Sequence, residues 1–526
     1  MKNVRCGMSC RSVVAVLAVS GLWASTASAQ LQDWSNVGGN GRTNGMVDVV
    51  GPDGAEGNNV LWQGGDLSFI AWHPVIEGRR VFMVRQIDFP PNPVPNDATI
   101  VAHDLDTGAV LWRADLPYEP GDWTTWIAGV KNGRVFAARS GNGGSVSSPL
   151  YCLDAATGQV LWSTAGTPPL FEDRYEVTGG PYAGAVFADD GDIIIPSPRF
   201  IDRVDGQTGA RVWSVPRVEQ VSNSSGIAIN GDALYVVDLK IGAGNRLTVR
   251  RFNAATGAFL YDGPLMAGGL LENAPFIGPD GRIYVPFAQN FNVQADYLYS
   301  FTDTGSGIVQ NWRTSANGGG AFSRWSVGRD GSVYSMAWTG TQDFAAEGRL
   351  QRLDPSTGEV IGESAEPITA DYMQIHMAVD QRGVLYVSNG NAGGLGGGRL
   401  YSFNPDLSLR WSIPMPGNLN QGGPALGTDG TLVVASTENN VWAFRTPRSV
   451  RCSLADVFGG SEPGLSPDGT VDGSDFIAFI NSFAIGDASV DALADVAGAG
   501  DDGLQPDGTI DGSDFIAFIN AFAVGC

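Results

Sequence analysis

The stretch that decides the fold is DLDTGAVLW, residues 104–112, because copies of it recur along the chain. Close copies end at Trp162 and Trp213, weaker ones at Tyr261, Trp312, Gly362 and Trp411, and NNVLW ends at Trp62 without the preceding turn. From Trp62 onward, successive end positions lie 50, 50, 51, 48, 51, 50 and 49 residues apart. A repeat of about 50 residues that contains several short strand patterns is typical of a β-propeller blade.

A second repeat supports the same count. It is a turn glycine followed by a short strand of β-branched or aromatic residues. Its glycines are Gly78, Gly133, Gly191, Gly231, Gly281, Gly331, Gly383 and Gly430. Glycine tolerates the positive φ that tight hairpin turns need. Two repeats that each occur eight times predict an all-β, eight-bladed propeller.

The residues of the first motif are explained by a turn and by packing, and we assign them no catalytic or binding role. Its Asp side chain can accept from backbone N–H groups two residues on, Thr supports the same turn, and Gly takes the left-handed position. The aromatic residue then lies on the outer strand, where it can fill the seam between blades. The last copy, from Gly430 to Arg445, lacks an outer strand. We therefore expect the strand of residues 58–62 to complete the last blade, so that an N-terminal strand closes the ring.

The N-terminus predicts export. Lys2, Arg5 and Arg11 precede an apolar core of residues 13–24, and an A-x-A site at 27–29 places the mature start near Gln30. A retained membrane anchor is the alternative. We expect a signal peptide over 1–29, the propeller over 30–447 and a separate module over 451–526. The net charge of −23 excludes nucleic acid as a partner.

The D-x-x-T-G-x-x-x-W repeats resemble those of the pyrroloquinoline quinone (PQQ) propeller superfamily, over roughly residues 34–445. The resemblance implies the fold but no single function. The superfamily includes quinoprotein dehydrogenases and cofactor-free propellers, among them the lipoprotein scaffold of outer-membrane barrel assembly. Kelch propellers have a similar period, but the Gly-Gly pairs that mark them are not periodic here.

Catalysis is not expected. Quinoprotein alcohol dehydrogenases typically hold the quinone against a disulfide of adjacent cysteines, whereas this sequence has no adjacent cysteines and no C-x-x-C-H haem site. Related soluble quinoproteins also lack that cysteine pair, so its absence is not decisive. We assign no catalytic residue and expect no bound PQQ. The alternative is an enzyme, either a PQQ-dependent dehydrogenase or a polysaccharide-degrading glycosidase or lyase. Several tryptophans would line a sugar-binding face or pack between blades: Trp72, Trp123, Trp126 and Trp338.

The C-terminal segment is acidic and duplicated. Residues 451–526 hold thirteen acids and one base, and residues 454–487 repeat as 493–526 with an offset of 39. Each copy contains P-D-G-T-[VI]-D-G-S-D-F. Aligned to an EF-hand loop, the motif places calcium ligands at positions 5, 7, 9 and 12. The predicted ligands are Asp468, Thr470, Asp472 and Asp475 in the first copy, and Asp507, Thr509, Asp511 and Asp514 in the second. A helix follows, with Phe476, Ile480 and Phe483 on one face.

This loop–helix duplication resembles a type I dockerin, the module that tethers cellulosomal proteins to cohesins. The resemblance implies two calcium ions, a protein partner and a polysaccharide-breakdown context. The spacing departs from the pattern, because Asp456 precedes Asp468 by twelve residues, as Asp495 precedes Asp507. Either an insertion enlarges the loop and Asp456 and Asp495 remain ligands, which we favour, or Gly464 and Ser466 take those places. An acidic helical hairpin without metal is the remaining alternative.

Three cysteines remain after the signal peptide. Cys452 and Cys526 bracket the acidic module and are expected to form a disulfide, whereas Cys152 lies in an apolar strand pattern and is expected to be a buried free thiol. The sequence thus predicts an exported binding or scaffolding propeller that docks through a calcium-binding module. A polysaccharide ligand on the propeller fits this context. The docking partner, such as a cohesin-like or envelope component, and the final site (periplasm, cell surface or outside) stay open.

Overall fold

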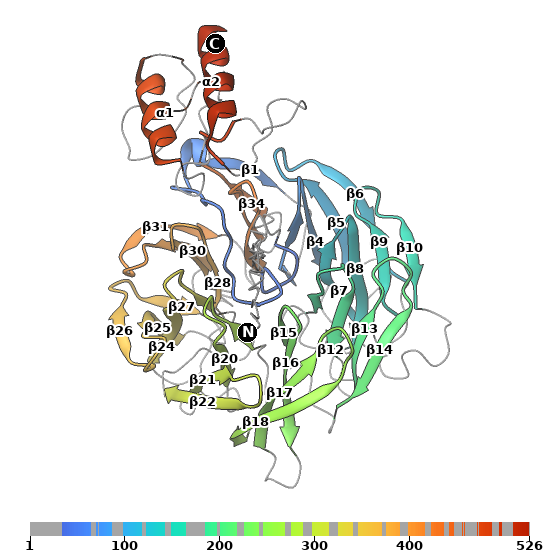
Figure 1. Ribbon diagram of the computed structural model, residues 1–526. Helices are drawn as coiled ribbons and strands as arrows, with labels where there is room; N and C mark the ends of the chain where they lie inside the picture. Colours follow the sequence, from blue (N-terminus) through green and yellow to red (C-terminus); the bar gives the residue numbers. More distant parts are fainter. Residues whose placement is uncertain are drawn as a thin grey trace, which may run out of the picture.

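The structure is a computed structural model. It describes residues 34–64, 70–71, 73–86, 98–117, 122–141, 149–164, 185–196, 200–217, 226–240, 246–268, 275–287, 297–314, 325–339, 346–370, 375–389, 398–415, 422–435, 441–446, 455, 457, 471, 473–486, 494–496 and 509–524. Within these residues the strands form eight sheets, each of four or five strands. The sheets follow one another around a central axis (Figure 1), which confirms the eight-bladed propeller.

The first four blades follow one another along the chain. Blade one contains β2 (Ile70–Ala71), β3 (Val75–Glu77), β4 (Arg80–Gln86), β5 (Ala98–Asp104) and β6 (Val110–Ala114). Blade two contains β7 (Asp122–Lys131), β8 (Arg134–Gly141), β9 (Tyr151–Asp154) and β10 (Val160–Ser163). Blade three contains β11 (Val186–Phe187), β12 (Ile193–Pro196), β13 (Phe200–Val204) and β14 (Arg211–Pro216). Blade four contains β15 (Ile227–Asn230), β16 (Ala233–Lys240), β17 (Arg246–Asn253) and β18 (Phe259–Gly268).

The next three blades and the C-terminal helices complete the order. Blade five contains β19 (Phe276–Ile277), β20 (Ile283–Phe287), β21 (Tyr297–Asp303) and β22 (Ile308–Thr314). Blade six contains β23 (Ser326–Val327), β24 (Val333–Thr339), β25 (Ala346–Leu353), β26 (Val360–Glu363) and β27 (Ile368–Ala370). Blade seven contains β28 (His376–Val379), β29 (Leu385–Ser388), β30 (Gly398–Phe403) and β31 (Leu409–Met415). After the ring come helices α1 (Gly473–Ile485) and α2 (Gly512–Val524).

Blade eight joins the two ends of the ring. Its sheet order is β1-β34-β33-β32, with β32 (Gly422–Leu426), β33 (Leu432–Ala435) and β34 (Val441–Phe444) from the end of the ring. The fourth strand, β1 (Val60–Gly64), comes from the N-terminal side, after the short 3-10 helix Gly57–Asn59. Trp62 pairs with Ala443 and Gly64 with Val441. This antiparallel pairing confirms the predicted closure, and it removes the free sheet edges that an open ring would expose.

Burial explains why inner and outer strands have different sequence patterns. β4 (RVFMVRQ) is buried along nearly its whole length because neighbouring blades cover both of its faces. In the outer strand β6 (VLWRA), the first two residues are exposed and Trp112 is buried. Leu111 is an extra residue in the pairing with β5, since Val110 pairs with His103 and Trp112 with Ala102. Such a bulge turns the strand, and here it accompanies a Trp that packs inward at the seam.

The Trp of one blade packs on the turn of the next. Trp112 Nε1 donates to the carbonyl of Ala155 at 3.1 Å, and a Cβ atom at Gly158 would lie only 2.6 Å from the Trp112 ring. The same arrangement occurs at four other seams, between Trp62 and Gly108, Trp162 and Gly209, Trp213 and Gly257, and Trp312 and Gly358. The motif's glycine therefore has two reasons, a positive φ and a tryptophan lying against it.

At the seam between blades six and seven, the glycine and the large apolar residue change places. The position of the tryptophan holds Gly362, and the position of the turn glycine holds Leu407, with a φ of +67°. Leu407 is only 2% exposed and belongs to the apolar cluster of this seam. A side chain is thus tolerated in the turn where the preceding blade contributes no aromatic ring.

The remaining turn predictions also hold. Asp104 Oδ1 accepts from the backbone of Asp106 at 3.1 Å and Thr107 at 2.8 Å. All eight glycines of the second repeat have φ between +56° and +93°. Cys152 is a buried free thiol, and burial raises its pKa to about 12. Because the thiolate is the reactive form, this cysteine is chemically quiet.

Candidate functional site

An N-terminal strap, Trp34–Gly51, follows the ring around its axis. The carbonyls of Trp34, Ser35, Gly41, Arg42 and Gly45 accept from Ile76, Val130, Ile229, Ile277 and Val379, all at 2.8 to 2.9 Å. Asn36 Nδ2 donates to Ala185 O at 3.0 Å, and Ser326 Oγ donates to Asn44 O at 2.6 Å. These bonds reach the first strands of blades one to seven in order. The strap was not predicted from the sequence, although its Gly- and Asn-rich composition is a signal of irregular backbone.

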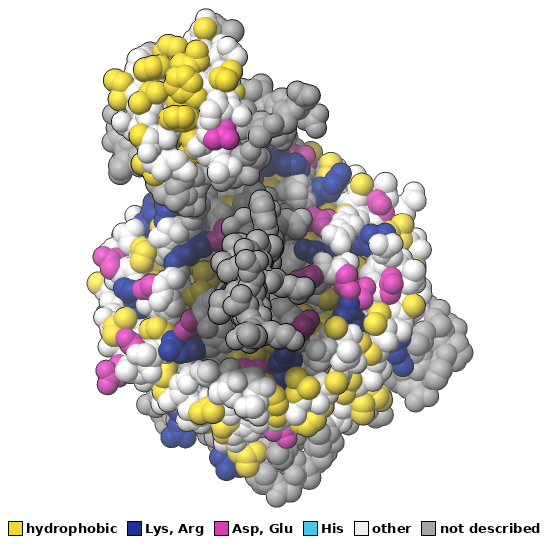
Figure 2. Space-filling model, in the orientation of Figure 1, with side chains coloured by type: hydrophobic (Ala, Val, Ile, Leu, Met, Phe, Trp, Pro, Cys, Tyr) yellow, Lys and Arg dark blue, Asp and Glu magenta, His cyan; other side chains and the backbone are white. Residues whose placement is uncertain are grey.

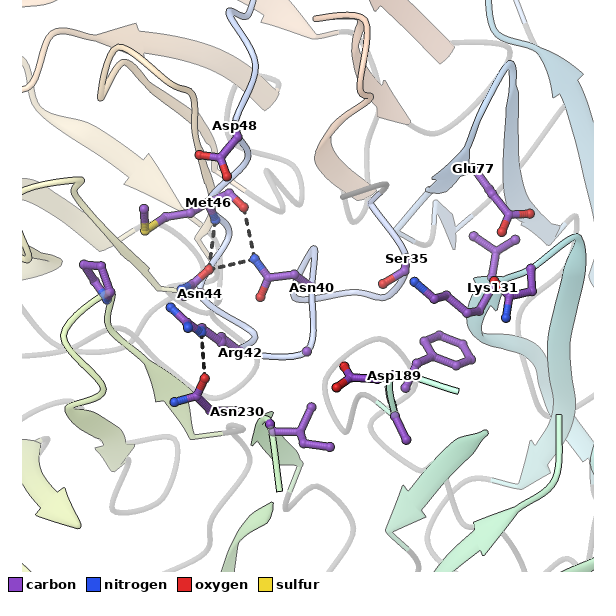
Figure 3. Close-up of a pocket in the computed structure, with 18 of the residues that line it drawn as sticks. Ser35, Asn40, Arg42, Asn44, Met46, Asp48, Glu77, Lys131, Asp189 and Asn230 are labelled. Atoms are coloured by element: carbon purple, nitrogen blue, oxygen red, sulfur yellow. Dashed lines mark hydrogen bonds between the residues drawn. The ribbon is translucent and has the colours of Figure 1, made fainter. Parts of the chain in front are cut away.

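The strap and the hairpin turns of the blades enclose a pocket of about 820 Å³ (Figure 3). Its lining is polar and carries both signs of charge. The strap contributes Asn40, Arg42, Asn44 and Asp48, and the blades contribute Glu77, Lys131, Asp189, Asn230 and Arg329. The pocket lies at the end of the ring that holds the turns between the first and second strands, and we call it the axial pocket.

Hydrogen bonds hold the strap side of the axial pocket in one conformation. Asn40 Nδ2 donates to Asn44 Oδ1 at 2.9 Å and to Met46 O at 3.0 Å. Asn44 Nδ2 donates to Ile277 O at 2.7 Å. Arg42 Nε donates to Asn230 Oδ1 at 3.2 Å, which joins the strap to blade four. The polar wall is thus preorganised by bonds within the protein.

Two histidines meet at the opposite end of the first strands. His73 precedes β3 of blade one and His376 begins β28 of blade seven, and their rings lie edge to face with centroids 4.1 Å apart. His73 Nδ1 accepts from Gly423 N of blade eight at 3.0 Å, so this nitrogen carries no proton. The contact joins three blades beside the closure. The sequence showed no metal-ligand spacing for these histidines, and nothing in their spacing announced that they meet.

Of the four tryptophans that could line a sugar-binding face, the structure describes the side chain of Trp126. Trp126 is 3% exposed and packs in the core between blades two and three, so it lines no open face. The side chains of Trp72, Trp123 and Trp338 lie outside the described residues.

The C-terminal helices pack with an approximate two-fold symmetry that follows the sequence duplication. Phe479 and its equivalent Phe518 are fully buried and stack with ring centroids 3.9 Å apart. The pairs Phe476–Phe522 and Phe483–Phe515 flank this stack at 5.7 and 5.4 Å. The predicted face is confirmed, because Phe476 contacts Phe522, Phe483 contacts Phe515 and Ile480 packs against the same cluster. Its most buried member, Phe479, was not predicted. Phe476 is 37% exposed and Phe479 is the core residue, because the second helix, and not the periodicity alone, decides which face is covered.

The aspartates at loop position 12, Asp475 and Asp514, lie in the first turns of the two helices and are buried. Asp475 Oδ1 accepts from Val457 N at 2.7 Å, and Asp514 Oδ1 accepts from Val496 N at 2.6 Å. Val457 and Val496 directly follow Asp456 and Asp495. Each long loop therefore returns to its own beginning across eighteen residues. Asp495 is 6% exposed and lies next to one of these contacts.

Asp511 and Asp514 also cap α2. Asp511 Oδ1 accepts from Ser513 N at 2.7 Å, and Asp514 Oδ2 accepts from Asp511 N at 2.8 Å. This reciprocal arrangement is a capping box. It gives both aspartates a structural role that does not depend on a metal. A carboxylate has about four lone-pair sites, so these bonds leave room for a cation.

The structure describes half of the predicted ligands. Asp475, Asp495, Thr509, Asp511 and Asp514 are described, whereas Asp456, Asp468, Thr470, Asp472 and Asp507 lie outside the described residues, as do Cys452 and Cys526. Among the residues that are described, no group of three or more His, Cys, Asp or Glu side chains is placed to hold a metal ion. The calcium sites and the disulfide stay predictions. No helix in the described part of the chain is long and apolar enough to cross a membrane.

Comparisons with solved structures identify the same fold. The chain is similar to a europium-containing methanol dehydrogenase, with a TM-score of 0.52 at 12% identity over 78% of this chain and 90% of that one. It is also similar to the quinohemoprotein alcohol dehydrogenase from Comamonas testosteroni, with a TM-score of 0.50 at 12% identity over 82% and 83%. BamB from Moraxella catarrhalis matches with a TM-score of 0.45 at 15% identity over 74% and 97%. At 12% identity, the likeness to the two dehydrogenases shows the fold alone.

A family model gives the relationship. The model of the outer membrane protein assembly factor BamB matches residues 96–364, just over half of the chain. A search of curated proteins finds no match. The dockerin resemblance of residues 451–526 stays a prediction. The match runs from β5 of blade one to the end of β26 of blade six. On this evidence the chain belongs to the BamB family of PQQ-type β-propellers.

Proposed function

We propose that this chain is an exported, non-catalytic binding propeller that docks to a protein partner through its C-terminal helix pair when calcium is bound. The carrying observation is the repeated contact of Asp475 with Val457 and of Asp514 with Val496. In an EF-hand loop, positions 1 and 12 both supply oxygen ligands. These contacts support the enlarged-loop hypothesis, because they hold the residues after Asp456 and Asp495 against the position-12 carboxylates.

The donor chemistry of the two loops fits calcium. The described candidates supply only oxygen atoms, from Asp475 in the first copy and from Asp495, Asp511 and Asp514 in the second. Hard oxygen donors favour Ca²⁺, whereas zinc prefers nitrogen and sulfur. A bound cation would neutralise these carboxylates and fix the start of each helix.

The helix pair also offers a surface for a partner. The equivalent residues Ile477 and Ile516 are each 63% exposed, and Ile485 is 58% exposed. Figure 2 shows apolar side chains gathered on this part of the molecule. An apolar patch of this kind on a small helical unit is typical of a protein-interaction site. The polysaccharide-breakdown context and a cohesin-like or envelope partner follow only from the dockerin resemblance and are part of the proposal.

Calorimetry of the full exported chain tests the calcium step. We expect two calcium ions per chain, and one ion for either Asp475→Asn or Asp514→Asn. Asp354→Asn is the matched control, because Asn253 already occupies the same turn position in blade four. The control should retain two sites. Absence of calcium binding at millimolar concentration would refute the docking mechanism.

Co-purification from the exported fraction tests the docking step. Ile477→Asp combined with Ile516→Asp should abolish calcium-dependent capture of a partner. Ile361→Asp changes an isoleucine of blade six that is 52% exposed, and it should leave capture unchanged. Equal capture by all three proteins would count against the helix pair as the docking surface.

A second candidate function is PQQ-dependent alcohol oxidation. The fold that this chain shares with the methanol and alcohol dehydrogenases favours this candidate. At 12% identity, the shared fold does not say which residues would bind PQQ. Dye-linked oxidation of alcohols or sugars that appears only after addition of PQQ and calcium would overturn the non-catalytic proposal. If the absorption spectrum of the chain mixed with PQQ equals the sum of the two separate spectra, that result would support the non-catalytic proposal.

A further inference from the structure

Opposite charges alternate around the axial pocket. Lys131 at the end of β7, Asp189 in the turn after β11 and Arg42 of the strap face the same space (Figure 3). On the other side, Asp48 and Arg329 form an ion pair. Glu77 lies on the same side as Lys131, and its Oε2 accepts from Gly133 N at 2.9 Å. The lining thus holds three cations and three carboxylates and is neutral overall, although the chain carries −23.

Two of these charges are available to a ligand. Among the described residues, neither the half-buried Lys131 ammonium nor the exposed Asp189 carboxylate has a hydrogen-bond or ion-pair partner. Arg42 is held by the neutral amide of Asn230, so its charge is not cancelled by that contact. Strong donors and a strong acceptor therefore line one space within a preorganised wall.

The alternating positive and negative side chains of the axial pocket favour a ligand without net charge. An anion would be attracted by Lys131 and Arg42 but repelled by Asp189, and a cation would meet the reverse. Hydroxyl groups donate to a carboxylate and accept from an ammonium or guanidinium group equally well. Hydrogen bonds to charged groups are also stronger than those between neutral groups. A neutral ligand with many hydroxyls gains from both signs and is repelled by neither.

We propose that the axial pocket binds a neutral oligosaccharide. The cavity of about 820 Å³ is within the range of roughly 300 to 1,000 Å³ that is usual for small-ligand sites. The hydrogen-bonded strap reduces the ordering that binding would require. This inference rests on the proposed binding role of the propeller and is independent of the C-terminal helix pair.

Calorimetric titration of the full exported chain tests the inference. The probes are neutral trisaccharides of glucose, mannose, xylose and galactose, with trigalacturonate as the anionic comparator. We expect at least one neutral trisaccharide to bind with a Kd that changes less than twofold between 50 and 500 mM NaCl. Trigalacturonate should bind at least tenfold more weakly. Binding only of trigalacturonate, or no binding of any neutral probe at millimolar concentration, would overturn the proposal.

Variants locate the site. Lys131→Met and Asp189→Asn should each weaken the neutral ligand at least tenfold. Lys240→Met should leave its Kd unchanged, because Lys240 ends β16 at the opposite end of blade four from Gly231, which lines the pocket. Equal affinity in all three variants would remove the axial pocket as the site. The titrations are run in calcium and in chelator. If the chain binds the sugar but no calcium, only the docking proposal is refuted. If it binds calcium but no sugar, only the proposal for the axial pocket is refuted.

Discussion

The ring and the C-terminal helix pair are both built from internal repeats, but different contacts hold them. At five seams of the ring, a tryptophan packs on a glycine and donates to a backbone carbonyl, and a backbone ladder closes the circle. In the helix pair, one phenylalanine stack forms the centre and two buried aspartates tie the long loops to the helices. The described contacts of the ring are tryptophan seams and backbone pairing, whereas the helix pair holds buried carboxylates at its helix starts.

Chelation should separate the two regions most strongly. α1 and α2 have thirteen residues each, and isolated helices of about this length are marginal in water. Without calcium, we expect repulsion between the loop carboxylates to outweigh the hydrogen bonds that Asp475, Asp511 and Asp514 make at the helix starts. We expect EGTA to abolish the helical circular dichroism of α1 and α2 and to leave the melting temperature of the ring unchanged. Retained helicity in EGTA, or a ring that melts with the helices, would contradict the comparison.

Removing one seam tryptophan should be the largest change within the ring. Trp112→Ala deletes a ring that is 9% exposed and the donor to Ala155. Loss of a buried Trp typically costs about 3 to 5 kcal/mol. Chemical denaturation should show this loss in the ring, with the calcium-dependent helicity unaffected. The neighbouring Leu111→Ala, at 45% exposure, is the control and should change the free energy of unfolding by less than about 0.5 kcal/mol.

A pair of glycine variants isolates the packing part of the seam. Gly158 and Gly305 both lie in the hairpin between the third and fourth strands of their blades, with φ of +74° and +80°. A Cβ at Gly158 would lie 2.6 Å from Trp112, whereas one at Gly305 meets nothing within 4 Å. Gly305→Ala should cost about 1 to 2 kcal/mol for the left-handed backbone. Gly158→Ala should cost roughly 1 to 3 kcal/mol more, because it also overpacks the seam. Equal losses in urea denaturation would show that the tryptophan contact adds nothing.

The ring could be predicted from the sequence because most blades repeat the same turn and five seams repeat the same tryptophan–glycine contact. The period of about 50 residues and the incomplete last copy together required an N-terminal strand in blade eight, and Trp62 is in that strand. The Leu407 turn looked like a weak copy of the motif. Leu407 is tolerated there because the neighbouring blade has Gly362 at the position of the tryptophan. The sequence around Leu407 alone does not show this.

The axial pocket could not be predicted from the sequence. Its strap binds the blades through backbone groups in irregular conformation, so it leaves no periodic side-chain pattern. Arg42, Lys131 and Asp189 lie far apart in the chain and line one pocket only in the folded propeller. In the helix pair, the motif identified Asp475 and Asp514 as the residues that open the helices. It missed Phe479, because a helix face is chosen by its partner.

The smallest expected effect is the acid sensitivity of the ring closure. Asp429 of blade eight accepts from Arg79 of blade one at 2.5 Å and from Arg445 at 2.7 Å. Burial raises the pKa of Asp429, but hydrogen bonds from Thr431, Arg79 and Arg445 lower it by more, so it lies below its usual value of 3.8. A lowered pKa means that the contribution to stability is present above about pH 4 and is lost as the pH falls through the folded-state value. Asp429→Asn should reduce the free energy of unfolding at pH 7 by about 1 kcal/mol. The difference between the two proteins should vanish once the pH has fallen below the folded-state pKa of Asp429, where both carry a neutral side chain. A difference that persists in urea denaturation at that pH would mean that shape, and not charge, explains the role of Asp429 in the closure.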